Sequence, residues 1–89
     1  DAACRRVIEE AGFGEYFVHS TGHGVGLDVH EAPYASTSGK GELRESMTLT
    51  IEPGIYVPGK GGVRIEDTLI ITSGVPKVIT QYPKELTVL

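Results

Sequence analysis

The chain has 89 residues, a formal net charge of −4 at pH 7, and eight Lys and Arg residues dispersed along its length. A chain of this size forms one small domain with a modest core, and without a basic stripe we expect no nucleic-acid partner. No apolar run is long enough to cross a bilayer, so we expect no membrane partner either.

The single cysteine, Cys4, cannot form an internal disulfide. It is most simply a small apolar residue on a helix, and one cysteine is typical of a reducing compartment, so we expect a cytoplasmic protein. The sequence opens on Asp1 inside a helical pattern, without an initiator methionine or signal peptide. These features favour a piece of a longer protein.

Helical spacing predicts an amphipathic helix over residues 1–11 that ends at Gly12. Its apolar side is formed by Ala3, Val7, Ile8 and Ala11. Its charged residues are expected to face solvent, and these are Arg5, Arg6, Glu9 and Glu10. Residues 16–18 then predict a short extended segment that leads into the next part of the chain.

All three histidines lie between Val18 and Pro33, where they alternate with glycines. Each glycine would cost a helix about 1 kcal/mol relative to alanine, so an extended or looped segment is predicted. His19 and His23 then share a face, whereas His30 needs a turn to reach it. The absent side chains at Gly22, Gly24 and Gly26 are expected to let a ligand approach the backbone.

Residues 34–46 are small and polar and predict a loop. Alternating apolar residues predict strands over 47–52 and 63–71, and a shorter strand over 75–80. Residues 55–57 continue the first strand beyond Pro53, where we expect a bulge because proline cannot donate to the ladder. Residues 58–62 form the turn of the resulting hairpin.

Two glutamates, Glu52 and Glu66, lie on the polar faces of these two strands. If the hairpin is centred near Lys60, Glu66 lies opposite Gly54, and the glutamates are diagonal neighbours. Diagonal side chains start roughly 7 to 8 Å apart, close enough for two carboxylates to converge on one cation.

The two carboxylates repel each other unless a positive charge lies between them. Arg64 shares the face of Glu66 and could form an ion pair there. The alternative is a divalent cation held by both glutamates and a histidine, because carboxylate and imidazole together suit Mn, Co, Fe or Zn. Such an ion would also activate a water molecule.

Three segments together resemble a known family: His19 to Pro33, Thr50-Ile-Glu-Pro-Gly, and Val63-Arg-Ile-Glu-Asp-Thr. They are similar to the C-terminal part of the catalytic domain of Xaa-Pro peptidases, the prolidase and aminopeptidase P branch of the methionine aminopeptidase superfamily. The resemblance runs essentially end to end. It implies an α+β pita-bread fold, here one helix plus a curved antiparallel sheet, with a two-metal site.

The resemblance also implies a role for each site residue. His23, Glu52 and Glu66 match metal ligands, and Glu52 is also assigned the acid/base role toward the attacking water. His19 and His30 match histidines that contact the substrate, and Arg64 matches an arginine that supports the site. The expected substrate is a proline-containing peptide.

Two aspartate ligands of the family have no match in this chain, and Asp28 and Asp67 do not lie at their positions. We therefore expect residues 1–89 to be a C-terminal fragment of a metallopeptidase catalytic domain that is inactive alone. The full protein would bind two divalent ions (Mn, Co or Zn) and form a homo-oligomer; the fragment would hold at most one ion weakly. A non-catalytic pita-bread module that binds peptides is the alternative.

Overall fold

The structure, a computed structural model, describes all 89 residues. One helix and one 3-10 helix precede seven short strands, and every strand pairing is antiparallel. A five-stranded sheet has the order β2-β1-β3-β6-β7, and β4 and β5 form a separate pair. The elements are α1 (Ala2–Glu10), η1 (Gly14–Tyr16), β1 (Gly22–Gly24), β2 (Glu31–Ala35), β3 (Thr48–Ile51), β4 (Gly54–Val57), β5 (Gly61–Arg64), β6 (Asp67–Ile70) and β7 (Lys77–Val78).

The helix α1 forms where the sequence predicts it, and Gly12 follows with the expected positive φ of 88°. Its orientation differs from the prediction. Val7 is 63% exposed, whereas Arg5 is turned inward and forms hydrogen bonds with the segment after η1. The predicted apolar side was wrong because an inward arginine can be satisfied by backbone carbonyls, which hydrophobic periodicity does not register.

The segment after the helix is also more compact than predicted. Gly14–Tyr16 is a 3-10 turn, not an extended strand, and the amides of Tyr16 and Phe17 bond back to Phe13 and Gly14. This turn places Phe17, which is only 3% exposed, in the small core.

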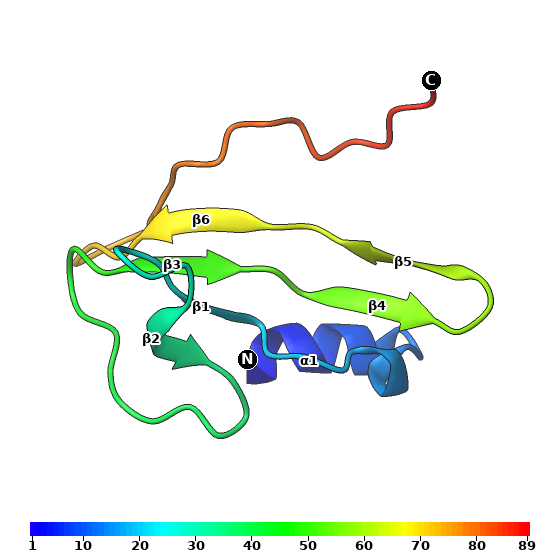
Figure 1. Ribbon diagram of the computed structural model, residues 1–89, viewed down its shortest axis with the longest axis horizontal. Helices are drawn as coiled ribbons and strands as arrows, with labels where there is room; N and C mark the ends of the chain where they lie inside the picture. Colours follow the sequence, from blue (N-terminus) through cyan, green and yellow to red (C-terminus); the bar gives the residue numbers. More distant parts are fainter.

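The predicted hairpin is present as one long two-stranded ribbon that runs through β3 and β4 and returns through β5 and β6 (Figure 1). The ladder is interrupted between Ile51 and Gly54, yet the register is the same on both sides: Ile51 pairs with Asp67, and Gly54 pairs with Arg64. No residue is inserted, so the bulge expected at Pro53 is absent. The amide of Ile65 donates to the carbonyl of Pro53 at 3.4 Å, which fits this register.

The register brings Glu52 directly opposite Glu66, rather than onto the diagonal as predicted. The turn accounts for the difference, since Val57 pairs with Gly61 and the hairpin is therefore centred one residue before Lys60. Directly opposed residues at a non-hydrogen-bonded position have Cα atoms about 4.5 Å apart. The two glutamates thus originate closer together than the sequence suggested.

A bulge does occur, in β1 at the histidine itself. The pairing of β1 with β2 shifts between His23 and Gly24, where Gly24 pairs with Glu31. The strand β2 was not predicted, because Tyr34 and Ala35 were assigned to a loop. Its pairing with β1 is what folds the histidine-glycine segment back on itself.

Few residues are buried: seven of 89, with Phe17 and Leu49 as the hydrophobic core and Thr21 and Thr50 as buried polar residues. Residues after β7, drawn orange to red in Figure 1, form no further helix or strand, but Thr80 and Lys84 still contact Thr68 and Asp67 of β6. No helix is long and apolar enough to cross a membrane. The site described below therefore lies on a sheet that few other residues of this chain cover.

Candidate active site

The candidate site is built where β1 lies beside β3. The amide of His23 donates to the hydroxyl oxygen of Thr50 at 3.1 Å, and the amide of Glu52 donates to the carbonyl of Thr21 at 2.6 Å. The hydroxyl of Thr50 donates in turn to Oε1 of Glu52 at 3.0 Å. One buried threonine therefore holds both a histidine backbone and a glutamate side chain.

The side chains of His23 and Glu52 meet directly, with Nε2 of His23 at 2.9 Å from Oε1 of Glu52. Nδ1 of His23 lies 2.8 Å from the carbonyl oxygen of Gly24. A carbonyl can only accept, so Nδ1 carries the hydrogen and Nε2 is the nitrogen that faces the carboxylate. A carboxylate oxygen can only accept as well, so Nε2 donates to Glu52 here, and a metal ion bound between the two side chains would replace that hydrogen.

His19 also lines the cleft and is hydrogen-bonded to Tyr56. Its Nδ1 donates to the carbonyl of Ser20 at 2.7 Å, so its Nε2 accepts the hydroxyl hydrogen of Tyr56 at 2.9 Å. Sequence reasoning did not single out Tyr56. Alternation along β4 is a signal that could have found it, because Tyr56 shares the face of Glu52 and Gly54.

Arg64 takes the position predicted for an ion pair, since its Nε lies 3.5 Å from Oε2 of Glu52. The hydrogen bond with Tyr56 raises the pKa of Arg64 above its ordinary value, and the charges of Glu52 and Glu66 act in the same direction. Arg64 is half-exposed, so this pair stabilises the fold only weakly. Its effect is to orient the second carboxylate oxygen of Glu52.

The predicted turn does bring His30 back beside His23. The amide of Gly26 donates to the carbonyl of Asp28, and the ring centroids of His23 and His30 lie 4.4 Å apart. Five of the six predicted site residues line one cleft of about 450 Å³. They are His19, His23, His30, Glu52 and Arg64.

Glu66 is the exception: its side chain is exposed and does not line the cleft. No group of three or more His, Cys, Asp or Glu side chains is gathered closely enough to hold a metal ion. Two metal-binding groups, Nε2 of His23 and the carboxylate of Glu52, do fit a divalent cation in chemistry and in their closeness to each other. Glu66 is opposite Glu52 in the register, although its exposed side chain is not part of the pair.

The glycines of β1 let neighbouring segments of the chain approach closely, and Gly22 also lines the cleft, where the predicted approach of a ligand stays a prediction. A Cβ at Gly22 would lie 1.7 Å from the carbonyl oxygen of Thr50, and one at Gly24 would lie 2.4 Å from that of Ala32. Gly22 therefore lets β1 approach β3 closely enough for the contacts of Thr50. Thr50 was placed on the polar face of its strand by sequence, but its role was not foreseen.

Comparison with known proteins shows relatives that match nearly the whole chain. A Xaa-Pro dipeptidase from Pyrococcus furiosus is 52% identical over 86 residues, which are 97% of this chain and 25% of that protein. A Xaa-Pro dipeptidase from Pyrococcus horikoshii is 56% identical, over 97% of this chain and 24% of its own length. The chain thus spans about a quarter of the length of these relatives.

Solved structures of such peptidases also match nearly the whole chain. A dipeptidase from Pyrococcus horikoshii OT3 matches with a TM-score of 0.93 and 56% identity over 97% of this chain and 24% of its own. An X-Pro aminopeptidase from Thermotoga maritima matches with a TM-score of 0.95 and 42% identity over 100% of this chain and 25% of its own.

The helix and antiparallel sheets are therefore a segment of a pita-bread domain, the fold class of these peptidases. The sequence pattern of metallopeptidase family M24 matches residues 1–73, and the chain belongs to that family. The family and fold predicted from the three motifs are confirmed.

Proposed function

We propose that this chain is the C-terminal part of the catalytic domain of a dinuclear metallopeptidase that hydrolyses Xaa-Pro bonds. The observation that carries the proposal is the pair of His23 and Glu52, with Nε2 and Oε1 at 2.9 Å and Nδ1 committed to the carbonyl of Gly24. The names of the relatives, Xaa-Pro dipeptidase and X-Pro aminopeptidase, support the substrate class.

In this proposal His23, Glu52 and Glu66 hold the metal. Glu66 joins when a cation offsets its repulsion from Glu52, because the register places the two residues opposite each other. A divalent cation held there would polarise the scissile carbonyl and make water a stronger nucleophile at neutral pH. Carboxylate and imidazole donors favour Mn, Co or Zn.

The other cleft residues act on the substrate and on Glu52. His19 and His30, which line the same cleft as His23, contact the peptide. Glu52 exchanges a proton with the attacking water, and Arg64 holds its second oxygen in place. Arg64 keeps its positive charge during this exchange because a guanidinium is not deprotonated in proteins.

Three ligands are fewer than a two-metal site needs, so we propose that two aspartates lie outside these residues. The 89-residue chain would then bind at most one ion, weakly, and would not cleave peptides. In the full-length protein the substrate is a proline-containing peptide, and we propose a cytoplasmic homo-oligomer. The lone Cys4 supports a reducing compartment.

The test is hydrolysis of Xaa-Pro peptides by the full-length protein with added Mn²⁺. We expect cleavage that Glu52→Gln reduces by at least about 100-fold, the usual scale for a general acid/base. The exposed Glu45→Gln serves as the control and should retain activity. Binding of the peptide without cleavage would instead identify a non-catalytic peptide-binding module. Cleavage by the purified 89 residues alone would contradict the need for outside ligands.

A further inference from the structure

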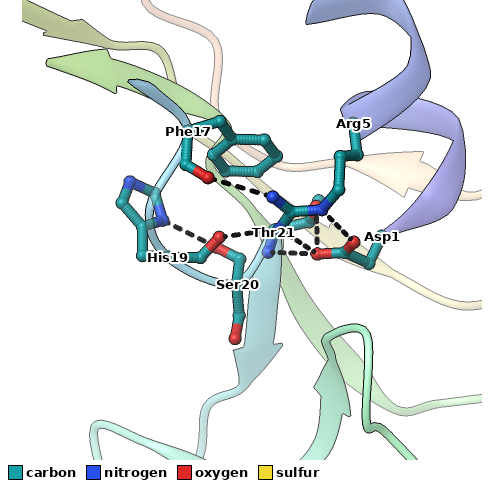
Figure 2. Close-up of polar contacts among 6 residues, drawn as sticks. All are labelled: Asp1, Arg5, Phe17, His19, Ser20 and Thr21. Carbon is teal, nitrogen blue, oxygen red and sulfur yellow. Dashed lines mark hydrogen bonds and ion pairs between the residues drawn. The ribbon is translucent and has the colours of Figure 1, made fainter. Parts of the chain in front are cut away.

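The inward-facing side chain of Arg5 forms a charged cluster with Asp1 beside the segment that carries His19. The contacts of the cleft residues described above do not explain this cluster. The guanidinium of Arg5 forms two hydrogen bonds with Asp1, from Nε at 2.9 Å and from Nη2 at 3.2 Å (Figure 2). The Asp1 side chain is only 3% exposed, and that of Arg5 is 23% exposed. This is a largely buried ion pair on a helix that has no fully buried residue.

The same two side chains hold the backbone that carries His19. Arg5 donates to the carbonyl of Phe17 at 2.9 Å and to that of His19 at 3.1 Å. Asp1 accepts from the amide and the hydroxyl of Thr21, at 3.2 and 3.1 Å. Figure 2 shows the guanidinium between the Asp1 carboxylate and these carbonyls. The backbone is therefore held on both sides of Ser20.

The geometry points to Asp1 and Arg5 as positioning residues that direct the His19 ring into the cleft. Arg5 also stacks 4.2 Å from the Phe17 ring centroid, and the Phe17 ring meets the His19 ring edge-on at 5.4 Å. Both the backbone and the ring of His19 thus depend on the guanidinium. The consequence for catalysis rests on the proposed function, whereas the placement of His19 does not.

The planar fork of arginine is what the arrangement needs. One guanidinium donates to two backbone carbonyls and two carboxylate oxygens at once, and a lysine ammonium cannot reproduce that pattern. Arg6, the next residue, is 74% exposed and reaches only Glu10 at 4.0 Å. It is a matched control on the same helix.

The experiment compares Arg5→Gln, Arg5→Lys and Arg6→Gln in the full-length protein. The histidine ring nitrogens are followed by NMR, and kcat, KM and Mn²⁺ affinity are measured. We expect Arg5→Gln to shift the ring resonances of His19 but not those of His23, and to lower kcat about 10- to 100-fold, the scale of a misplaced catalytic group. Metal affinity should stay within about twofold. Arg5→Lys should be intermediate, and Arg6→Gln should match wild type.

Unchanged His19 resonances in both Arg5 variants would overturn the proposal. It would also be overturned if the His23 resonances shifted as much as those of His19 and the Mn²⁺ affinity fell together with kcat. If Arg5→Gln does not fold, Arg5→Lys, which keeps the charge, decides by the same criteria. If wild type shows no hydrolysis, the proposed function fails while the resonances of His19 still test the positioning role of Arg5.

Discussion

The Nε2 atom of His23 lies 2.9 Å from the Oε1 atom of Glu52, although the two residues belong to different strands. The hydroxyl of Thr50 joins them a second time, through the amide of His23 and the carboxylate of Glu52. The site is therefore positioned by strand pairing and by one buried hydroxyl.

Replacing Thr50 with valine keeps the side-chain shape and removes that hydroxyl. We expect Thr50→Val to weaken Mn²⁺ binding by the full-length protein about 10- to 100-fold, as is usual when a partner of a metal ligand is lost. The unpaired amide of His23 should also cost about 1–3 kcal/mol of unfolding free energy. Calorimetry and thermal melting measure both. Thr50→Ser, which retains the hydroxyl, should bind metal like wild type; equal affinities for Val and Ser would contradict this role.

Metal uptake by the 89-residue chain should depend on the three proposed ligands. We expect Ala substitutions at His23 and Glu52 to abolish measurable Mn²⁺ binding in titration calorimetry. Glu66→Ala should weaken it, which would show that the exposed carboxylate turns toward the pair when a cation is present. The exposed Glu45→Ala is the control. Uptake that survives Glu52→Ala unchanged would rule out this site.

Gly22 is required because β1 and β3 approach closely at that position. Alanine there would bring its Cβ to 1.7 Å from the backbone oxygen of Thr50, which cannot move without breaking the strand pairing. We expect Gly22→Ala to destabilise the full-length protein by about 3 kcal/mol or more. A Cβ at Gly74 would have no neighbouring atom within 4 Å, so Gly74→Ala should melt near wild type. Similar melting temperatures for the two variants would disprove the close approach.

Arg64 should contribute a stabilisation that does not change with pH over the usual range. A basic group with a raised pKa in the folded state stabilises fully below its unfolded pKa, and the effect is lost only as pH rises through the folded value. Both values lie far above neutral pH. The ordinary pKa of lysine is about 10.4. The melting temperature of Arg64→Lys should therefore decrease relative to that of wild type between about pH 9 and pH 11. A difference between the two melting temperatures that stays constant over this range would contradict this account.

The 89-residue chain should self-associate, because it buries few residues and exposes large apolar side chains. Val18, Leu27, Val29 and Val75 are all at least 71% exposed. Light scattering should show species larger than a monomer, and Leu27→Lys together with Val29→Lys should reduce them. A monodisperse monomer at high concentration would contradict this expectation.

The amino-acid sequence was sufficient to predict the helix, its stop at Gly12, the hairpin strands and the family, because these depend on local periodicity, on glycine and on motifs in order. It also indicated that His30 could reach the face of His23 only through a turn. It could not determine that Arg5 faces inward, since that depends on carbonyls contributed by residues far along the chain.

The register was likewise decided by the tertiary structure. A shift of the hairpin centre by one residue moved Glu66 from the diagonal to a place opposite Glu52, and the sequence of the turn allows either centre. The orientation of the His23 ring depends on the carbonyl of Gly24, and the approach of Thr50 depends on the missing side chain at Gly22. Side-chain chemistry thus named the candidates, whereas the pairing of β1 with β3 determined which of them meet.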